Sequence, residues 1–299
     1  MNRFIKDLFS PKLKAKVRQS RWYSMRVAIK LAKSSKRLDI CSSQFAHCLH
    51  LAGLKSLEGK VCMEIGAGWV LTHSLVCYLL GAERVIATDI TSFAKPEILP
   101  HAIQNSILSI SRDVLAPFST HSKVRERLQK LERIRSFNFS TLRELGIEYA
   151  SPIDLAAEKI DVAPDFIFSN SVLEHVPVDD TENLLQNLAS LLQENGVMIH
   201  CIHLEDHINI RKSPFEFYTL PEEAYGRTLQ TKRGNRIRSQ EWVKTFGKLP
   251  GCRSKLIYSF SREDKELPAD IDTSIKFSGT PDLRTSHIGV LTEKVAPVH

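Results

Sequence analysis

The sequence predicts an α/β protein with a seven-stranded, mostly parallel sheet that ends in an antiparallel pair of C-terminal strands. Between residues 60 and 203, short apolar segments alternate with segments of helical periodicity, as in parallel sheets with right-handed crossovers. The last two apolar segments follow one another without a helical pattern, which predicts an antiparallel pair. The 299 residues, 42% of them hydrophobic, suffice for one large core, and no apolar run approaches the ~20 residues that span a bilayer.

Residues 1–57 precede this alternation and are basic, with apolar side chains at helical spacing on both sides of Pro11. We expect them to form a helical N-terminal extension to a main domain at 58–299. Residues 1–37 hold twelve Lys and Arg and one acid, a net charge of +11, whereas the rest of the chain carries −4. The mildly acidic body argues against nucleic acid as its partner. An anionic partner would instead bind the basic arm.

The remaining elements follow in order from apolar runs and turn residues. Gly81 ends the first helix of the domain, and Asp89 directly follows the second strand. The expected strands are Lys60–Ile65, Arg84–Thr88, Ile147–Ala150, Asp165–Ser169, Val197–His203, Lys255–Phe260 and His287–Thr292, with helices at Leu71–Leu80 and Thr181–Leu192 and a helical stretch at 97–145.

A glycine turn follows the first expected strand and predicts a ligand site, because open α/β sheets bind ligands where their strands end. Gly66 and Gly68 let the backbone turn sharply and approach a ligand. A dinucleotide loop would have a third glycine where Leu71 stands, and its pyrophosphate would be repelled by Glu64. A cofactor with an ammonium or sulfonium charge suits this acid, and Asp89 can accept hydrogen bonds from the two hydroxyls of a ribose.

These residues resemble the motifs of class I methyltransferases that depend on S-adenosylmethionine (SAM). Glu64-Ile-Gly-Ala-Gly68 is similar to their first motif, E/D-x-G-x-G, and Thr88-Asp89-Ile90 to their ribose-binding element. The resemblance implies a Rossmann-like fold and SAM as cofactor, and it departs at Val70, where many members have a third glycine. The cofactor-binding residues it implies in this region are Glu64, Gly66, Ala67, Gly68, Asp89 and Ile90.

The segment 165–177, with the sequence DFIFSNSVLEHVP, extends the resemblance to the fourth strand of the same superfamily. By position, Asn170 and Ser171 would line the cofactor, and Glu174 and His175 would lie near the methyl acceptor. Asp154 matches, more loosely, the acid that commonly meets the adenine amino group. A neutral imidazole at His175 could accept a proton from an acceptor hydroxyl, but alignment alone can also drive this direct displacement.

The fifth strand ends in several ionisable side chains, among them His200, His203 and His207. Metal assistance is conceivable there, but strand alternation points His200 and His203 to opposite faces, so we expect no metal site. The run into Asp206-His207 resembles methyltransferases often found with polysaccharide or cell-envelope biosynthesis. In them an insertion follows, here at about 208–239, which is rich in aromatic and basic residues and could cover the acceptor.

The expected function is methyl transfer from SAM to an oxygen or nitrogen of a small or lipid-linked acceptor. The alternatives are a non-catalytic scaffold or regulatory protein that keeps the fold and, less in keeping with Leu71, an NAD-dependent oxidoreductase. The six scattered cysteines indicate reduced thiols and a cytoplasmic protein. Residues 1–37 could cover the sheet as a plain helix pair, attach the protein to an anionic membrane, or bind RNA, although no base-stacking module accompanies the charge.

Overall fold

The structure is a computed structural model, and it describes residues 25–26, 37–104 and 106–295. The helices expected in the basic arm therefore lie largely outside the described residues. Helix α4 (Arg37–Ala52) is the part of the expected extension that is described, and it packs against α5 and α7 within the core on one face of the sheet. The boundary at residues 57 and 58 stays a prediction.

The seven-stranded sheet has the order β3-β2-β1-β4-β5-β7-β6. The first five strands are parallel to one another, and β7 runs antiparallel to both β5 and β6. This confirms the predicted fold class. The strands are β1 (Val61–Ile65), β2 (Arg84–Thr88), β3 (Ile147–Ala150), β4 (Phe166–Asn170), β5 (Val197–His203), β6 (Cys252–Ser261) and β7 (Thr285–Lys294).

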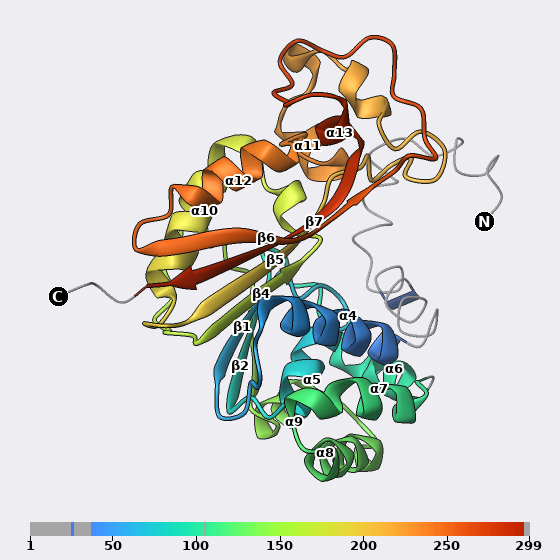
Figure 1. The fold of residues 1–299 in the computed structure, drawn as a ribbon. Helices are drawn as coiled ribbons and strands as arrows, with labels where there is room; N and C mark the ends of the chain where they lie inside the picture. Colours follow the sequence, from blue (N-terminus) through green and yellow to red (C-terminus); the bar gives the residue numbers. More distant parts are fainter. Residues whose placement is uncertain (1–24, 27–36, 105, 296–299) are drawn as a thin grey trace.

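Helices cover both faces of this sheet (Figure 1). Helices α4, α5, α6 and α7 lie over one face, and α10 and α12 lie over the other. The bounds of the helices after α4 are α5 (Thr72–Leu79), α6 (Leu99–Gln104), α7 (Leu108–Leu115), α8 (His121–Arg133), α9 (Phe139–Glu144), α10 (Val178–Leu191), α11 (Arg227–Arg233), α12 (Ser239–Gly247) and α13 (Thr280–Arg284). No helix among the described residues is long and apolar enough to cross a bilayer.

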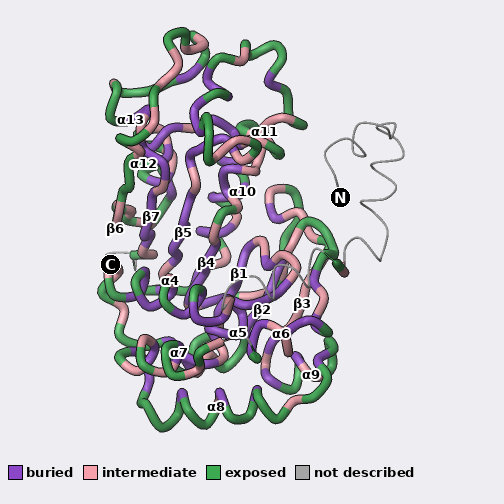
Figure 2. Tube along the Cα trace, turned by 90° about the vertical axis from the view of Figure 1, so that its right-hand side faces the viewer, coloured by how far each residue is buried: buried purple, intermediate pink, exposed green. Residues whose placement is uncertain are grey.

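The central strands are buried on both faces because helices sandwich them (Figure 2). In β1, Cys62 packs into the core beneath α4 and α5, while Met63 packs into the core beneath α10 and α12. Strand order reverses between β1 and β4, since β1 leads to β2 on one side and pairs with β4 on the other. The carboxyl ends of β1 and β4 therefore lie at the switch point where such sheets bind ligands.

The C-terminal pair departs from expectation in one detail. We expected β6 and β7 to be joined by a loop without a helix, but the short helix α13 precedes β7. Asp282 and Leu283 of α13 are buried, and the buried guanidinium of Arg238 donates to the carbonyl oxygens of both. Helix α13 is stabilised by tertiary contacts with Arg238, which directly precedes α12. Local periodicity in the sequence does not reveal such contacts.

Candidate active site

A cavity of about 890 Å³ opens at the carboxyl ends of the parallel strands. It is lined by the loops after β1, β2, β3 and β4 and by the first turns of α11 in the expected insertion. Of the residues predicted from the sequence, those in its wall are Gly66, Asp89, Ile90, Asp154, Ser171 and His175. Thus four segments that are distant in the sequence meet at one site.

The glycine loop approaches the β4 loop too closely for any side chain at Gly66. A β-carbon at this position would lie 2.4 Å from Cγ2 of Val172, and the backbone has φ +70°. Gly68 has φ +64°, and its added β-carbon would meet no described atom nearer than the Gly66 carbonyl oxygen at 4.0 Å. The loop is therefore a bare backbone cradle with room beside it for a ligand.

Asp89 anchors this cradle to the end of β2. One carboxylate oxygen accepts a hydrogen bond from the backbone N–H of Gly68 at 2.8 Å, and the other accepts from Thr91 at 2.9 Å. Burial raises the pKa of the Asp89 carboxyl. The two hydrogen bonds have the opposite, smaller effect, because they favour the charged form. The carboxylate is thus oriented in the cavity wall, where its remaining acceptor positions suit ribose hydroxyls.

Glu64 lies beneath the loop, outside the cavity lining. Its buried carboxylate accepts a hydrogen bond from Ser74 Oγ, and one oxygen lies 3.3 Å from Nδ1 of His73, both residues at the start of α5. Burial opposes a charge on His73, but Cys41 and Glu64 together raise the pKa of this imidazole to about 10. Glu64 therefore joins β1 to α5 and sets the direction of the glycine loop.

The end of β4 forms the opposite wall. Ser171 has φ 54°, a left-handed conformation that is strained for a residue with a side chain. Its backbone N–H donates to the Cys201 carbonyl at 2.9 Å, and its side chain contacts the cavity. The neighbouring Asn170 lies outside the cavity lining, where its side-chain oxygen accepts from Gln44 of α4 at 2.6 Å. Strain at the cavity wall is typical of functional positions.

His175 lies farther along the same wall, in the 3₁₀ turn Leu173–His175. Its Nδ1 lies 2.9 Å from the Thr231 carbonyl oxygen of α11 and must donate, because a carbonyl only accepts. This leaves the lone pair on Nε2. Burial is the main cause that lowers the pKa of His175, so the ring is neutral near pH 7.

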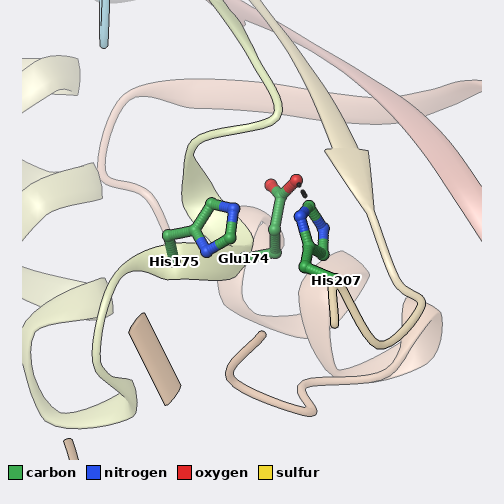
Figure 3. A group of neighbouring side chains, drawn as sticks. All are labelled: Glu174, His175 and His207. Carbon is green, nitrogen blue, oxygen red and sulfur yellow. Dashed lines mark ion pairs between the residues drawn. The ribbon is translucent and has the colours of Figure 1, made fainter. Parts of the chain in front are cut away.

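Glu174 lies outside the cavity lining and forms a cluster with His175 and His207 (Figure 3), in which Glu174 is buried and the two imidazoles are half-buried. It is 1% exposed, and one oxygen lies 3.5 Å from Nε2 of His207. Burial raises the pKa of Glu174 to about 8 and lowers that of His207 to about 3. We therefore expect both groups to be largely uncharged at neutral pH.

Several cavity residues were not predicted from the sequence. The rings of Trp69 and Phe93 stack with centroids 4.6 Å apart, and both contact the cavity. An aromatic residue directly after Gly68 is a signal that could have indicated Trp69. Arg227 of α11 also lines the cavity and pairs with Asp180 of α10. No local pattern predicts this pair, because it joins residues 47 positions apart.

The cavity carries three carboxylates, those of Asp89, Asp154 and Asp180, against one guanidinium, Arg227, which is paired with Asp180. This balance favours a cationic ligand over a pyrophosphate. A family model for a methyltransferase domain matches residues 42–248. The chain belongs to this methyltransferase family. The enzyme is a SAM-dependent methyltransferase with the Rossmann-like fold of its class, and its cofactor is SAM.

Solved structures with similar folds share little sequence with this methyltransferase. It is 12% identical to magnesium protoporphyrin IX methyltransferase from Synechocystis, with 95% of this chain and 96% of that chain covered and a TM-score of 0.44. For the YcgJ protein from Bacillus subtilis the identity is 11%, the coverage 85% and 100%, and the TM-score 0.45. No curated protein matches the sequence. The family match therefore carries the assignment.

Proposed function

We propose that this methyltransferase transfers the methyl group of SAM to an oxygen or nitrogen of a small or lipid-linked acceptor. The supporting observation is one cavity whose wall includes both the glycine loop and His175. In the reaction the acceptor atom bonds to the methyl carbon, the carbon–sulfur bond breaks, and its electron pair stays on sulfur. The acceptor's proton leaves to solvent or to a base.

The cofactor end of the cavity would be formed by the glycine loop and the neighbouring strand ends. Asp89 would accept hydrogen bonds from the ribose hydroxyls and Asp154 from the adenine amino group, and the support is that both carboxylates line the cavity. Glu64 would act from beneath the loop, by holding it and by adding negative charge near a sulfonium or ammonium. The residues proposed to form this end are Glu64, Gly66, Ala67, Gly68, Asp89, Ile90, Asp154 and Ser171, while Asn170, expected there from the sequence, bonds to Gln44 of α4 instead.

The acceptor end would lie between the β4 loop and α11, where His175, Arg227 and Thr231 share the cavity wall. The insertion at 208–239 would thus supply the lid over the acceptor. His175 lines this end of the cavity, and its Nδ1 donates to the Thr231 carbonyl oxygen, so the lone pair of the ring is on Nε2. Glu174 would affect the acceptor indirectly, through the neighbouring His175, with which it forms a cluster.

A first experiment separates this function from the alternatives. Calorimetric titration with SAM, with its demethylated product and with NAD should show binding of the first two only. Binding of NAD alone would indicate an oxidoreductase, and binding without turnover on any acceptor would favour a scaffold. Comparison of metabolites in cells with and without the gene, searching for pairs that differ by one methylene, would then identify the acceptor.

Asp89 gives the sharpest test of the cofactor end. Asp89→Ala removes a carboxylate whose hydrogen bonds to a ribose are worth roughly 1.5 to 3 kcal/mol, so SAM affinity should fall by about 10- to 100-fold. Asp113→Ala, which removes an exposed carboxylate paired with His121 on α8, is the matched control and should leave SAM affinity unchanged. Equal affinities of Asp89→Ala and wild type would place the cofactor elsewhere.

A lipid-linked acceptor would bring the protein to a membrane surface inside the cell. The basic arm supports this proposal, since a net charge of +11 over residues 1–37 would attract anionic headgroups. The arm lies largely outside the described residues, so the support is the charge pattern alone.

A further inference from the structure

Two loops at the carboxyl edge of the sheet bring three metal-ligating side chains together beside the cavity. Glu174 and His175 come from the turn after β4, and His207 comes from the loop after β5. Their ligand atoms all lie within 4.8 Å of one another. In Figure 3 the Glu174 carboxylate lies between the two imidazole rings, so the three side chains converge on one point.

The polar atoms of this group lack partners of the ordinary kind. Within the described residues, neither carboxylate oxygen of Glu174 makes a hydrogen bond, and neither does Nε2 of His207, which lies 3.5 Å from one of those oxygens. Glu174 is 1% exposed. Burial of a carboxyl group and an imidazole nitrogen without hydrogen bonds costs several kcal/mol, and a bound ion would offset this cost.

The loops that carry the group are held in place by the insertion. The side-chain amide of Asn235 donates to the carbonyls of Leu173 and Val176, each at 2.9 Å, and the Asn235 backbone N–H donates to the backbone carbonyl of Glu174 at 2.7 Å. On the other loop, the His207 backbone N–H donates to the backbone carbonyl of Arg233 at 3.1 Å. The ligand positions are thus fixed by contacts that do not use the ligand atoms.

His175 is already oriented as a ligand would be. Its Nδ1 donates to the Thr231 carbonyl, which fixes the tautomer and turns Nε2 toward Glu174. A second hydrogen bond of this kind, from the ring nitrogen that does not bind the ion, is the usual support of a metal-bound histidine.

We propose that Glu174, His175 and His207 bind one divalent transition-metal ion at the acceptor end of the cavity. Two imidazoles and one carboxylate suit Zn²⁺, Co²⁺ or Mn²⁺, and three protein ligands leave a position open for a substrate oxygen. The inference rests on the proposed methyl transfer and narrows it, because the acceptor would then carry a hydroxyl group that the ion polarises. His175 would act on the acceptor through the ion and not as a free base.

A neighbouring group of similar composition differs in one decisive respect. His203, Glu205 and His287 also place ligand atoms within 4.8 Å of one another. Glu205, however, already accepts from Arg262 at 2.8 Å and pairs with His203 at 2.6 Å. Its charge is balanced without an ion, so this second group provides the matched control.

The test uses the tag-free full chain, stripped with a chelator and titrated with Co²⁺. Visible absorption bands should report binding of one equivalent to nitrogen and oxygen ligands, and Zn²⁺ should displace it. Glu174→Gln and His207→Gln should each weaken Co²⁺ binding by at least about tenfold, while His287→Gln should bind as wild type does. Circular dichroism of each variant checks that it folds.

The outcomes separate the two proposals because SAM binding is measured by calorimetry on the same samples. Absence of Co²⁺ binding by the wild type, or unchanged binding by Glu174→Gln and His207→Gln, overturns the metal site while SAM binding stands. Loss of Co²⁺ binding in His287→Gln alone would place the ion at the second group and equally overturn it. Co²⁺ binding without SAM binding would overturn the proposed function and leave the site in place.

Discussion

Gly66 in the cavity wall packs against Val172 too closely for a β-carbon, so substitution by alanine should disturb the site. Gly66→Ala places a β-carbon 2.4 Å from Val172 Cγ2 and adds the strain of φ +70°. The glycine loop or the β4 loop must then move, so SAM affinity measured by calorimetry should fall by at least about tenfold.

Gly53 provides the matched control for this substitution. Its φ of +72° imposes the same strain on alanine, but an added β-carbon would meet no described atom within 4 Å. Gly53→Ala should therefore lower the free energy of unfolding by about 1 kcal/mol and leave SAM affinity unchanged. If both variants bind SAM equally well, the glycine loop is not the cofactor cradle.

His200 predicts part of the acid sensitivity of the fold. It is completely buried on β5 near Phe246 of α12, and burial lowers its pKa to about 3. An unfolded chain would bind a proton near pH 6.5, so between pH 6.5 and 3 the unfolded state holds one proton more. The free energy of unfolding therefore falls as pH falls, by about 1.4 kcal/mol per pH unit from this residue.

The measurement is urea denaturation at pH 7 and pH 5. Between pH 7 and pH 5, the free energy of unfolding should fall by about 2 kcal/mol more in the wild type than in His200→Asn, because asparagine does not bind a proton. Asn can also keep a hydrogen bond to Ser169 Oγ, which lies 2.7 Å from Nδ1 of His200. His121→Asn, at an exposed site on α8, should lose as much as wild type. Equal losses in all three proteins would contradict a neutral, buried His200.

At the scale of elements, the sequence predicts the strands because their signals are local. The third and fifth strands, Ile147–Ala150 and Val197–His203, have the bounds expected from apolar runs and turn residues. The contribution of α11 to the cavity depends on contacts across the fold. The cluster of Glu174 with His207 also depends on contacts across the fold. Alternation along β5 predicts that His200 and His203 point to opposite faces of the sheet, but it does not show which residues of other loops lie near the histidines.

The insertion also predicts how one hydrogen-bonding residue affects catalysis. Asn235→Ala removes three side-chain hydrogen bonds, two donated to the carbonyls of Leu173 and Val176 and one accepted from the Ile237 N–H, so the free energy of unfolding should fall by about 2 to 3 kcal/mol. The β4 loop would lose its register with α11. The KM of the acceptor should therefore rise several-fold, and by a larger factor than the Kd of SAM, because α11 lies at the acceptor end of the cavity.

Asn209→Ala is the control within the same insertion, because this side chain donates to Glu216 and not to the β4 loop. It should leave both the acceptor KM and SAM affinity near the wild-type values. A parallel loss of SAM affinity and acceptor binding in Asn235→Ala would show that the insertion supports the whole cavity and not only its acceptor end.

At the scale of the whole molecule, the two ends of the cavity have different structural origins. The cofactor end is built from strand ends of the sheet, where β1 pairs with β2 and the Asp89 carboxylate accepts from the backbone N–H of Gly68. The acceptor end is completed by α11 from the insertion. Substitutions in the insertion should therefore change acceptor preference more readily than cofactor preference.

The uneven distribution of charge along the whole chain leads to a last prediction, about membranes. Residues 1–37 carry a net charge of +11 and the remaining residues −4, so an anionic surface would attract the arm and repel the body. Lys12, Lys14 and Lys16 lie in the arm, outside the described residues. Each lysine near such a surface contributes about 1 kcal/mol, so replacing all three by Glu should weaken binding by at least about 100-fold. Co-sedimentation with anionic and neutral vesicles measures this binding.

The control replaces three exposed lysines of the body, Lys130, Lys159 and Lys248, by Glu, which changes the net charge equally. If both triple variants lose binding to the same extent, net charge and not the arm attracts the membrane. If wild type binds neutral and anionic vesicles alike, electrostatic attachment through the arm is wrong.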